Sequence, residues 1–285
     1  MNGRGVSSGT PVWRAPIGWR GRRDVWRQGG RRVRTGWCGY DDITPELGAQ
    51  GVEVVSHRID VEGFWRYVAE TGYRDMSYWD GGRARAGIEK WLEHFVSIEL
   101  MAPRAGQVFV DVASCYSPFP DILRERWACV TYRQDWAYPP GIDGDRIGSD
   151  AADLPLADES VDGLTLHCSF EHFEGDRDWQ FLQEAQRVLR RGGKLCILPI
   201  YTNHTYSIQT DLAAWYRRPT FERDALVWAA EGWGEVHGRF YDPPHFAARI
   251  LGNLRGMKPR MVRVENYLDV SPDCYLRFAA LFSKE

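Results

Sequence analysis

Three aspartates end three successive apolar runs, and they are the residues of this sequence best suited to hold a ligand. Asp111 ends the run VFVD, Asp135 ends CVTYRQD, and Asp150 follows the short run IG. If these runs are parallel strands, the three carboxylates leave the sheet at the same edge. Ionised carboxylates only accept hydrogen bonds, so they suit ribose hydroxyls and an adenine amino group. The set predicts a site for an adenosine without phosphates, although each aspartate alone could equally cap a helix or face solvent.

Strands and helices alternate along the middle of the chain. Predicted strands occupy residues 108–112, 129–135, 161–168 and 194–200, with a short one before Asp150. Predicted helices occupy residues 64–70, 88–100, 122–128 and 178–191. The strands are apolar almost throughout, so helices are expected to cover both faces of a parallel sheet. This architecture would bring the strand ends, and the aspartates on them, to one edge.

A resemblance to a known family is carried by SDAADLPLADESVDGLTLHCSFEHF (149–173) and FLQEAQRVLRRGGKLCILPI (181–200). Residues 108–200 resemble the class I S-adenosylmethionine-dependent methyltransferases, in the small-molecule, type-11-like branch. The resemblance implies an α/β, Rossmann-like fold: a seven-stranded, mostly parallel sheet with an antiparallel last strand and helices on both faces. Residues 261–266 and 274–283 would be strands six and seven. The implied cofactor is S-adenosyl-L-methionine.

The first turn of that family reads D-x-G-x-G-x-G, and this chain departs from it. Ala113, Cys115 and Ser117 stand in the three glycine places after Asp111. Glycine there supplies a positive φ and lets the backbone approach a ligand, whereas a positive φ costs other residues about 1–2 kcal/mol each. We therefore expect a different backbone path. The hydroxyls of Ser114 and Ser117 would replace a backbone donor to the methionine carboxylate.

The resemblance also assigns roles to residues at the strand ends. The expected cofactor-binding set is Asp111, Ala113, Ser114, Ser117, Asp135, Asp150, Ala151 and His167. His172, with Glu171 beside it, is the expected catalytic base for a hydroxyl or amine nucleophile. A histidine there could equally cap a helix or pack in the core. No metal site is expected, because H-x-x-x-E-H is one residue longer than the H-x-x-E-H zinc signature.

The favoured function is methylation of a small-molecule acceptor, with O-methylation preferred over N- or C-methylation. The altered first turn leaves open a catalytically silent domain that uses the same fold as a binding scaffold. A nicotinamide-dependent oxidoreductase ranks last, because the chain lacks the phosphate-binding G-x-G-x-x-G.

Two segments have less regular sequence: one precedes the predicted methyltransferase domain, 58–285, and the other is an insertion within it. Residues 1–45 are expected to be a disordered tail rich in Arg, Gly and Trp, because no strand or helix period appears. A nucleic-acid arm, a transit peptide and an over-long start without a role are the alternatives. Residues 201–260 are long and aromatic, so they are expected to form a lid or substrate insertion. Otherwise their aromatic side chains pack helices such as 223–230 onto the sheet.

Composition excludes several other classes of protein. Of 285 residues, 44% are apolar and 26% charged, which is typical of globular domains. A net charge of −3 gives no overall attraction to nucleic acid or anionic membranes. No apolar run is long enough to span a bilayer, and six scattered cysteines are typical of reduced thiols. We expect a cytoplasmic protein with a small-molecule substrate and no membrane or nucleic-acid partner; the sequence does not indicate an oligomeric state.

Overall fold

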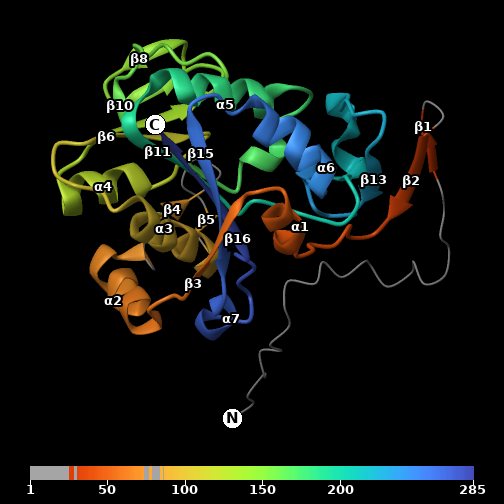
Figure 1. Cartoon of the computed structure of the whole chain (residues 1–285), viewed down its shortest axis with the longest axis horizontal. Coiled ribbons are helices and arrows are strands. Elements are labelled where there is room, and N and C mark those ends of the chain that lie inside the picture. Colours follow the sequence, from red (N-terminus) through yellow and green to blue (C-terminus); the bar gives the residue numbers. More distant parts are fainter. Residues whose placement is uncertain (1–25, 29–30, 74–76, 79–83, 86) are drawn as a thin grey trace.

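A nine-stranded sheet forms the centre of the molecule (Figure 1). The computed structural model describes residues 26–28, 31–73, 77–78, 84–85 and 87–285. The strands follow the order β3-β15-β16-β11-β10-β6-β7-β9-β8. Their bounds are β3 (Glu53–His57), β6 (Val108–Val112), β7 (Val130–Asp135), β8 (Gly141–Asp143), β9 (Arg146–Gly148), β10 (Val161–His167), β11 (Leu189–Leu198), β15 (Met257–Val264) and β16 (Phe278–Lys284).

The strand directions match the predicted architecture. Strands β11, β10, β6, β7 and β9 are parallel to one another, and β16 is antiparallel to both β11 and β15. The α/β, Rossmann-like fold and its antiparallel last strand are therefore confirmed. The sheet has nine strands instead of the predicted seven, because β3 is added at one edge next to β15 and β8 is added at the other edge next to β9.

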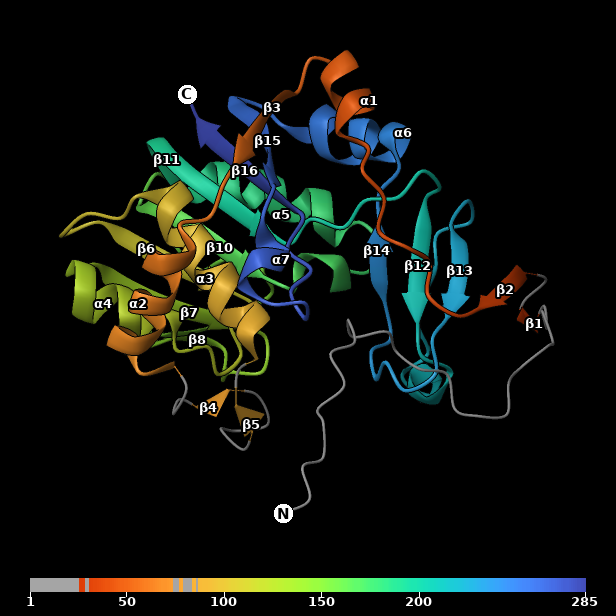
Figure 2. The same cartoon turned by 90° about the horizontal axis from the view of Figure 1, so that it is seen from below.

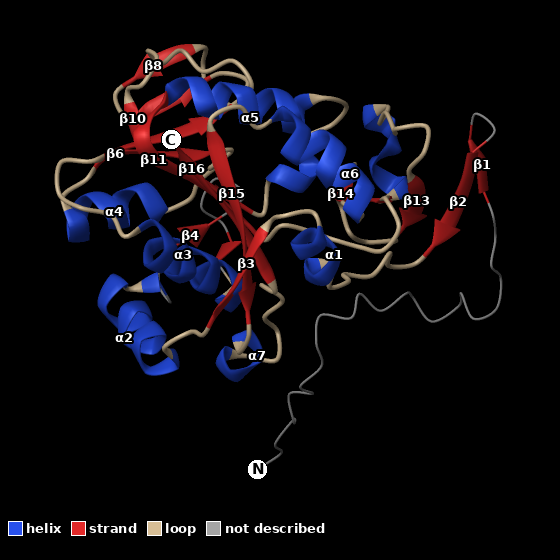
Figure 3. Ribbon diagram, viewed as in Figure 1, coloured by secondary structure: helices blue, strands red, loops and turns tan. Residues whose placement is uncertain are grey.

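Helices cover both faces of this sheet, as predicted (Figure 3). Their bounds are α1 (Thr44–Ala49), α2 (Val61–Thr71), α3 (Ile88–Met101), α4 (Phe119–Trp127) and α5 (Arg177–Val188). In β6, Phe109 packs in the core that contains α2, α3 and α4, whereas Val110 and Val112 pack in the core that contains α1 and α5. This alternation with a period of two explains why apolar residues occupy both faces of the strand.

A second, five-stranded sheet stands beside the first (Figure 2). Its strands, in spatial order, are β1 (Trp26–Gln28), β2 (Arg31–Thr35), β13 (Leu226–Ala229), β12 (Ser207–Thr210) and β14 (Gly238–Phe240). Shorter elements are β4 (Ser77–Tyr78), β5 (Ala84–Arg85), η2 (Phe170–His172), η3 (Leu212–Arg217), α6 (Pro243–His245), η4 (Phe246–Ile250), η5 (Leu251–Asn253) and α7 (Tyr267–Val270). Strands β12 to β14 lie within the predicted insertion, 201–260.

Two local predictions fail in this second sheet. The expected tail through residue 45 is wrong for residues 31–45, because β2 pairs in parallel with β13 and buries Val33 against Val227. The expected helix at 223–230 is also wrong, because β13 takes up residues 226–229 between β12 and β2. Both segments acquire regular structure from distant partners, which outweigh local propensity. Residues 26–28 of the predicted tail form β1, and residues 1–25 and 29–30 lie outside the described residues.

Within the described ranges, none of the helices combines the length and apolar character that a bilayer crossing requires.

Candidate active site

The turn after β6 keeps a backbone conformation that usually requires glycine. Ala113 has a φ of 52° and Cys115 a φ of 50°. The expectation of a different backbone path is therefore wrong at these two glycine places. Each left-handed residue costs about 1–2 kcal/mol, so surrounding contacts must stabilise the turn.

Strand β7 supplies those contacts. Gln134 accepts from the Ala113 N–H through Oε1 at 3.1 Å and from the Ser114 N–H through its main-chain oxygen at 2.9 Å. Asp135 Oδ2 accepts from the Cys115 N–H at 2.9 Å. Sequence reasoning missed Gln134, since an amide inside a predicted strand carries no distinctive signal. Three hydrogen bonds from the neighbouring strand thus fix the turn.

Asp135, the predicted ribose contact, ends β7 beside the turn. Its carboxylate is buried, and Oδ1 accepts a further hydrogen bond from the Ala137 N–H at 2.9 Å. Because an ionised carboxylate offers about four acceptor positions, the two bonds to main-chain N–H groups leave capacity for sugar hydroxyls.

Asp111 and His167 form a buried pair at the ends of β6 and β10. Asp111 Oδ1 lies 2.9 Å from His167 Nδ1 and accepts from the Thr165 hydroxyl at 2.9 Å. Among the described residues, Asp111 Oδ2 has no hydrogen-bond partner. A buried acceptor without a donor is costly, and an ammonium group of a ligand at the turn would supply that donor.

Asp150 and Ala151 are less closely tied to the turn. Asp150 is exposed; its Oδ1 accepts from the Ala152 N–H at 2.9 Å, and its Oδ2 lies 3.3 Å from the Arg177 guanidinium. Ala151 is buried in the core. Gln134 connects this segment to the turn, because its Nε2 donates to the main-chain oxygen of Ser149 at 2.6 Å.

The two serines of the turn are buried. The Ser117 hydroxyl accepts from the Phe119 N–H at 3.2 Å at the start of α4, and the Ser117 N–H donates to the Ser114 main-chain oxygen at 2.9 Å. The Ser117 hydroxyl thus supports the helix start, and its own proton remains available for donation.

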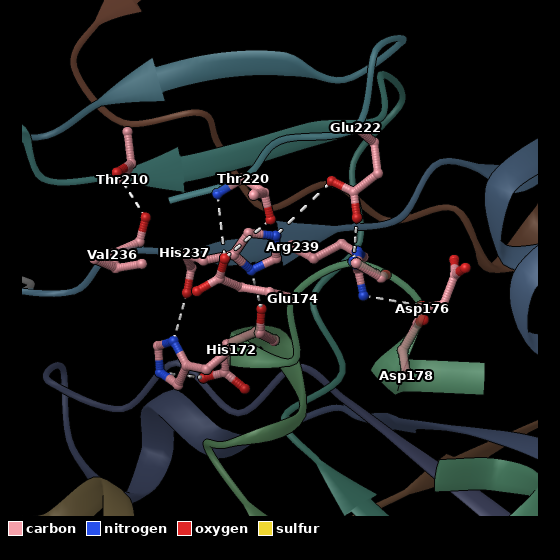
Figure 4. A network of polar contacts seen from close by, with 12 residues as sticks. His172, Glu174, Asp176, Asp178, Thr210, Thr220, Glu222, Val236, His237 and Arg239 are labelled. Atoms are coloured by element: carbon pink, nitrogen blue, oxygen red, sulfur yellow. Dashed lines mark hydrogen bonds and ion pairs between the residues drawn. The ribbon is translucent and has the colours of Figure 1, made fainter. Parts of the chain in front are cut away.

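The expected catalytic pair lies on the short helix η2, which faces the second sheet (Figure 4). Glu171 is buried, whereas the His172 side chain is 34% exposed. His172 Nε2 lies 3.6 Å from Glu171 Oε1, and its Nδ1 lies 2.5 Å from the main-chain oxygen of His237. The structure therefore brings Glu171 and His172 together and connects them to the predicted insertion.

A buried polar cluster between α3 and the ends of β10 and β11 was not predicted. Lys90 Nζ donates to Glu93 Oε2 at 2.7 Å and to the His167 main-chain oxygen at 3.0 Å. Glu89 Oε2 accepts from the Tyr275 N–H at 2.9 Å. Burial raises the pKa of both glutamates, and the neighbouring Glu93 charge adds to the effect at Glu89.

Cys168 extends this cluster at the end of β10. Its Sγ lies 3.5 Å from the Tyr201 hydroxyl and 3.4 Å from the Tyr275 hydroxyl. Burial raises the pKa of Cys168, Tyr201 and Tyr275, so all three groups hold their protons at neutral pH. The cluster can therefore offer uncharged donors to a polar small molecule at the carboxyl edge of the sheet.

This cluster could not be predicted from the local sequence, because Glu89, Lys90 and Glu93 have the spacing of a solvent-exposed helical face. The overlooked signal is that apolar residues of α3, including Val96 and Met101, extend beyond a single stripe. A helix that is apolar on more than one side is buried all round, and its polar residues are then buried too.

A surface hollow bordered by Arg124, Thr131 and Asp145 lies beside the amino-terminal half of β7, away from the turn. In the part of the chain that the structure describes, no group of three or more His, Cys, Asp or Glu side chains is placed to hold a metal ion.

Comparisons with known proteins concern the same region. A family model described as "Methyltransferase domain" matches residues 136–197. A "Demethylmenaquinone methyltransferase" from Thermotoga maritima is 35% identical over 112 residues, which cover 39% of this chain and 44% of that enzyme. The "Ubiquinone/menaquinone biosynthesis C-methyltransferase UbiE" from Rubrivivax gelatinosus is 31% identical over 183 residues, which cover 58% of this chain and 68% of that enzyme.

The chain is also similar to solved structures. One is the Burkholderia thailandensis 1,6-didemethyltoxoflavin-N1-methyltransferase with bound 1,6-didemethyltoxoflavin and S-adenosylhomocysteine, at 11% identity and a TM-score of 0.48 over 91% of this chain and 97% of that one.

Proposed function

Because this chain belongs to the class I S-adenosylmethionine-dependent methyltransferases, we propose that it methylates a small-molecule acceptor on an oxygen atom. The observation that supports this most directly is the turn after β6. Ala113 and Cys115 are held there with positive φ by Gln134 and Asp135. A turn that only connected β6 to α4 would not need this strain, and stored strain is typical of ligand sites.

The residues at the strand ends fit the predicted cofactor. Asp135 is proposed to accept from ribose hydroxyls and Asp150 from an adenine amino group, while the Asp111 oxygen without a hydrogen-bond partner would accept from an ammonium group. The small side chain of Ala113 permits close approach, and Ser114 is proposed to donate to the methionine carboxylate. When bound, S-adenosylmethionine supplies an activated methyl group.

Ser117, Ala151 and His167 complete the proposed cofactor set. Ser117 would donate its hydroxyl proton while still accepting from α4. Ala151 would form an apolar wall beside the nucleoside. His167 would fix the Asp111 carboxylate through their contact of 2.9 Å.

His172 and Glu171 are proposed to handle the acceptor proton. An acceptor hydroxyl would give its proton to His172 Nε2 as its oxygen attacks the methyl carbon of the cofactor. His172 would thus act as a general base near neutral pH. Glu171 lies 3.6 Å from that nitrogen and would stabilise the positive charge that the imidazole gains. Its Oε2 has no hydrogen-bond partner among the described residues, so it can also bind a polar group of the acceptor.

Residues 201–260 are proposed to close over the acceptor and exclude water. The Tyr201 and Phe240 ring centroids lie 4.9 Å apart with their planes tilted, Trp37 lies 5.6 Å from Phe240, and Tyr40 lies 5.1 Å from Tyr201. These rings join the proposed lid to the main sheet, because Tyr40 also packs against Phe278 of β16. Cys38, Cys129, Cys168, Cys196 and Cys274 are thiols outside any disulfide, which supports the proposal of a reducing, cytoplasmic location.

Calorimetric titration with S-adenosylhomocysteine tests the cofactor assignment. Binding in the micromolar range is expected for the unchanged protein, as for most enzyme ligands. Asp135→Asn should weaken it at least tenfold, because a ribose acceptor is replaced by a donor-bearing amide. Asp143→Asn, at an exposed aspartate of β8, is the matched control and should leave affinity unchanged. No heat at millimolar ligand, from folded protein, would end the proposal.

Methylation on carbon is the second candidate, because the Rubrivivax relative is a C-methyltransferase by name. The two outcomes are separated by carbon NMR of the product formed from a donor with a ¹³C-labelled methyl group. A methyl resonance typical of an ether supports O-methylation, whereas one typical of a ring or chain methyl supports C-methylation.

A catalytically silent binding scaffold is favoured by one observation: both oxygens of Asp135 already accept main-chain N–H groups. That alternative predicts that Asp135→Ala and Asp150→Ala change neither ligand affinity nor the rise in melting temperature on addition of S-adenosylhomocysteine. The methyltransferase proposal predicts that both changes reduce that rise.

A further inference from the structure

His237 joins the second sheet to the short helix that carries Glu171 and His172 (Figure 4). Its ring Nδ1 lies 3.0 Å from the Glu171 main-chain oxygen. Its own main-chain oxygen lies 2.5 Å from the His172 ring Nδ1. The two contacts run in opposite directions between the same two segments, so they fix both the position of η2 and the orientation of the His172 ring.

The contact partners determine which nitrogen of His172 holds the proton. A main-chain carbonyl oxygen only accepts, so His172 Nδ1 must be the donor in this contact. In the neutral ring the lone pair is then on Nε2. Nε2 is the nitrogen that lies 3.6 Å from Glu171 Oε1. The geometry therefore leaves the basic nitrogen on the side of the ring that faces the Glu171 carboxylate.

The same reasoning applies to the His237 ring. Its Nδ1 must donate to the Glu171 carbonyl, and its Nε2 lies 3.9 Å from Glu222 Oε2, beyond hydrogen-bond distance. Burial lowers the pKa of His237, so its ring is neutral at neutral pH. Burial opposes the ionisation of Glu222, but its ion pair with the Arg239 guanidinium keeps its pKa low, at about 2. Glu222 is therefore a carboxylate that holds Arg239.

A buried ionic chain anchors His237 in place. Arg239, on β14 two residues after His237, is fully buried and contacts Glu222, Asp178 Oδ2 at 2.9 Å and the Gly175 main-chain oxygen at 2.8 Å. Thr220 donates to Glu174 through both its N–H and its hydroxyl at 3.2 Å. The insertion thus holds the segment from η2 to the start of α5 along its length, and His237 is the contact nearest the reactive pair.

We infer that His237 is a positioning residue for methyl transfer: it holds η2 so that His172 carries its proton on Nδ1 and presents Nε2 as the base. This inference rests on the proposed function, since it gives a reason for the base to be His172. It also gives residues 201–260 a second task besides covering the acceptor. The insertion sets the tautomer of the catalytic histidine.

Nitrogen NMR of protein labelled with ¹⁵N-histidine tests this inference without an acceptor. Long-range ¹H–¹⁵N spectra at about pH 8, where a histidine of ordinary pKa is neutral, distinguish the two tautomers. His172→Gln identifies the His172 signals by their loss. The unchanged protein should show His172 in a single tautomer with the proton on Nδ1. An Nε2–H tautomer in the unchanged protein overturns the inference, whatever the variants do.

Two variants of His237 separate positioning from a merely structural role. His237→Asn keeps an N–H donor near the place of Nδ1 and should preserve the single tautomer. His237→Gln places its amide near Nε2 instead, frees the Glu171 carbonyl and should give a mixture of tautomers. His204→Asn, at an exposed histidine of the same insertion, is the matched control. Unchanged His172 spectra in folded His237→Gln would also overturn the inference.

Titration of the same samples with S-adenosylhomocysteine keeps the two proposals apart. Affinity in both His237 variants should stay within about threefold of the unchanged protein, because His237 does not touch the turn after β6. If the unchanged protein fails to bind but shows the expected tautomer, the proposed function fails and the positioning of His172 stands.

Discussion

Two turns at the carboxyl edge of the main sheet are stabilised in different ways. The turn after β6 takes its hydrogen bonds from Gln134 and Asp135, which lie about 20 residues further along the chain on the adjacent strand. The turn after β10, which contains η2, is held by His237, which lies 65 residues beyond His172 and directly before β14 of the second sheet. One turn is fixed inside a local unit of strand, turn, helix and strand, whereas the other depends on contacts with a separate sheet.

This difference divides the site into two parts that should respond independently. The part proposed for the cofactor is a local unit of β6, β7 and the turn between β6 and α4. The part proposed for the acceptor depends on the contact between the second sheet and α5, which the buried ion pairs of Arg239 with Glu222 and Asp178 maintain. Changes in the second sheet should therefore loosen η2 and leave S-adenosylhomocysteine binding intact, and changes in β7 should do the reverse.

The largest effect is expected from Arg239→Met. Removal of this buried guanidinium takes the arginine partner away from Glu222 and leaves Arg249 as the remaining ionic partner of Asp178. Loss of one member of a buried ion pair costs about 3–5 kcal/mol. Urea unfolding measures the change. Folded Arg239→Met protein should still bind S-adenosylhomocysteine.

Arg217→Met is the matched control, because that arginine is exposed on η3. It should change the free energy of unfolding by no more than about 0.5 kcal/mol. A loss below about 1 kcal/mol in Arg239→Met would show that the two sheets do not depend on this chain of charges.

An intermediate, pH-dependent effect is expected from Glu89→Gln. The folded-state pKa of Glu89 is raised by burial, so the unfolded chain loses this proton at a lower pH than the folded protein. The stability of the unchanged protein must then fall as pH rises from about 4.3, the ordinary value for glutamate, to the raised value. The amide does not ionise and avoids this loss, which is about 1.4 kcal/mol for each pKa unit.

Melting temperatures at pH 4 and pH 8 measure this difference. Glu89→Gln and the unchanged protein should melt together at pH 4, and the variant should melt higher at pH 8. Glu125→Gln, at an exposed position of α4, should follow the unchanged protein at both values. A variant that gains nothing at pH 8 would mean that Glu89 is not desolvated.

The smallest effects are expected in the turn after β6. Cys115→Gly should remove the cost of positive φ, about 1–2 kcal/mol, and should lose about 0.5–1 kcal/mol through the greater freedom of the unfolded chain. A net gain of about 0.5–1 kcal/mol in the free energy of unfolding follows, and Ala113→Gly should behave alike. Ala137→Gly, which lacks a positive φ, should instead destabilise, so the sign separates the two cases in urea unfolding.

Local patterns were enough to predict the sheet edge that carries the proposed cofactor site. Alternating apolar strands and periodic helices predicted the sheet, and the acids at strand ends predicted the places of Asp111 and Asp135. The backbone of the turn was not predictable from Ala113 and Cys115 themselves, because the residues that stabilise their conformation are on β7. Glycine is the usual solution at such places, and hydrogen bonds from a neighbouring strand are another.

The acceptor side could be predicted only in part. His172 and Glu171 follow a recognisable strand, but their partner His237 is in a segment whose order depends on β2, near the start of the chain. Val33 shows no periodic pattern that would link it to Val227. The polar residues of α3 were hidden for a different reason, because burial of both sides of a helix is a property of the whole fold.

One measurement tests the methyltransferase assignment most directly. Purified protein is incubated with a metabolite extract and S-adenosylmethionine that carries an isotopically labelled methyl group, and the products are analysed by mass spectrometry. The account predicts a labelled small molecule that forms with the unchanged protein and with Asp143→Asn, and at least about 10²-fold more slowly with His172→Gln, the usual scale for loss of a general base. Equal labelling with and without the protein, across extracts and in a sample that binds S-adenosylhomocysteine, would contradict it.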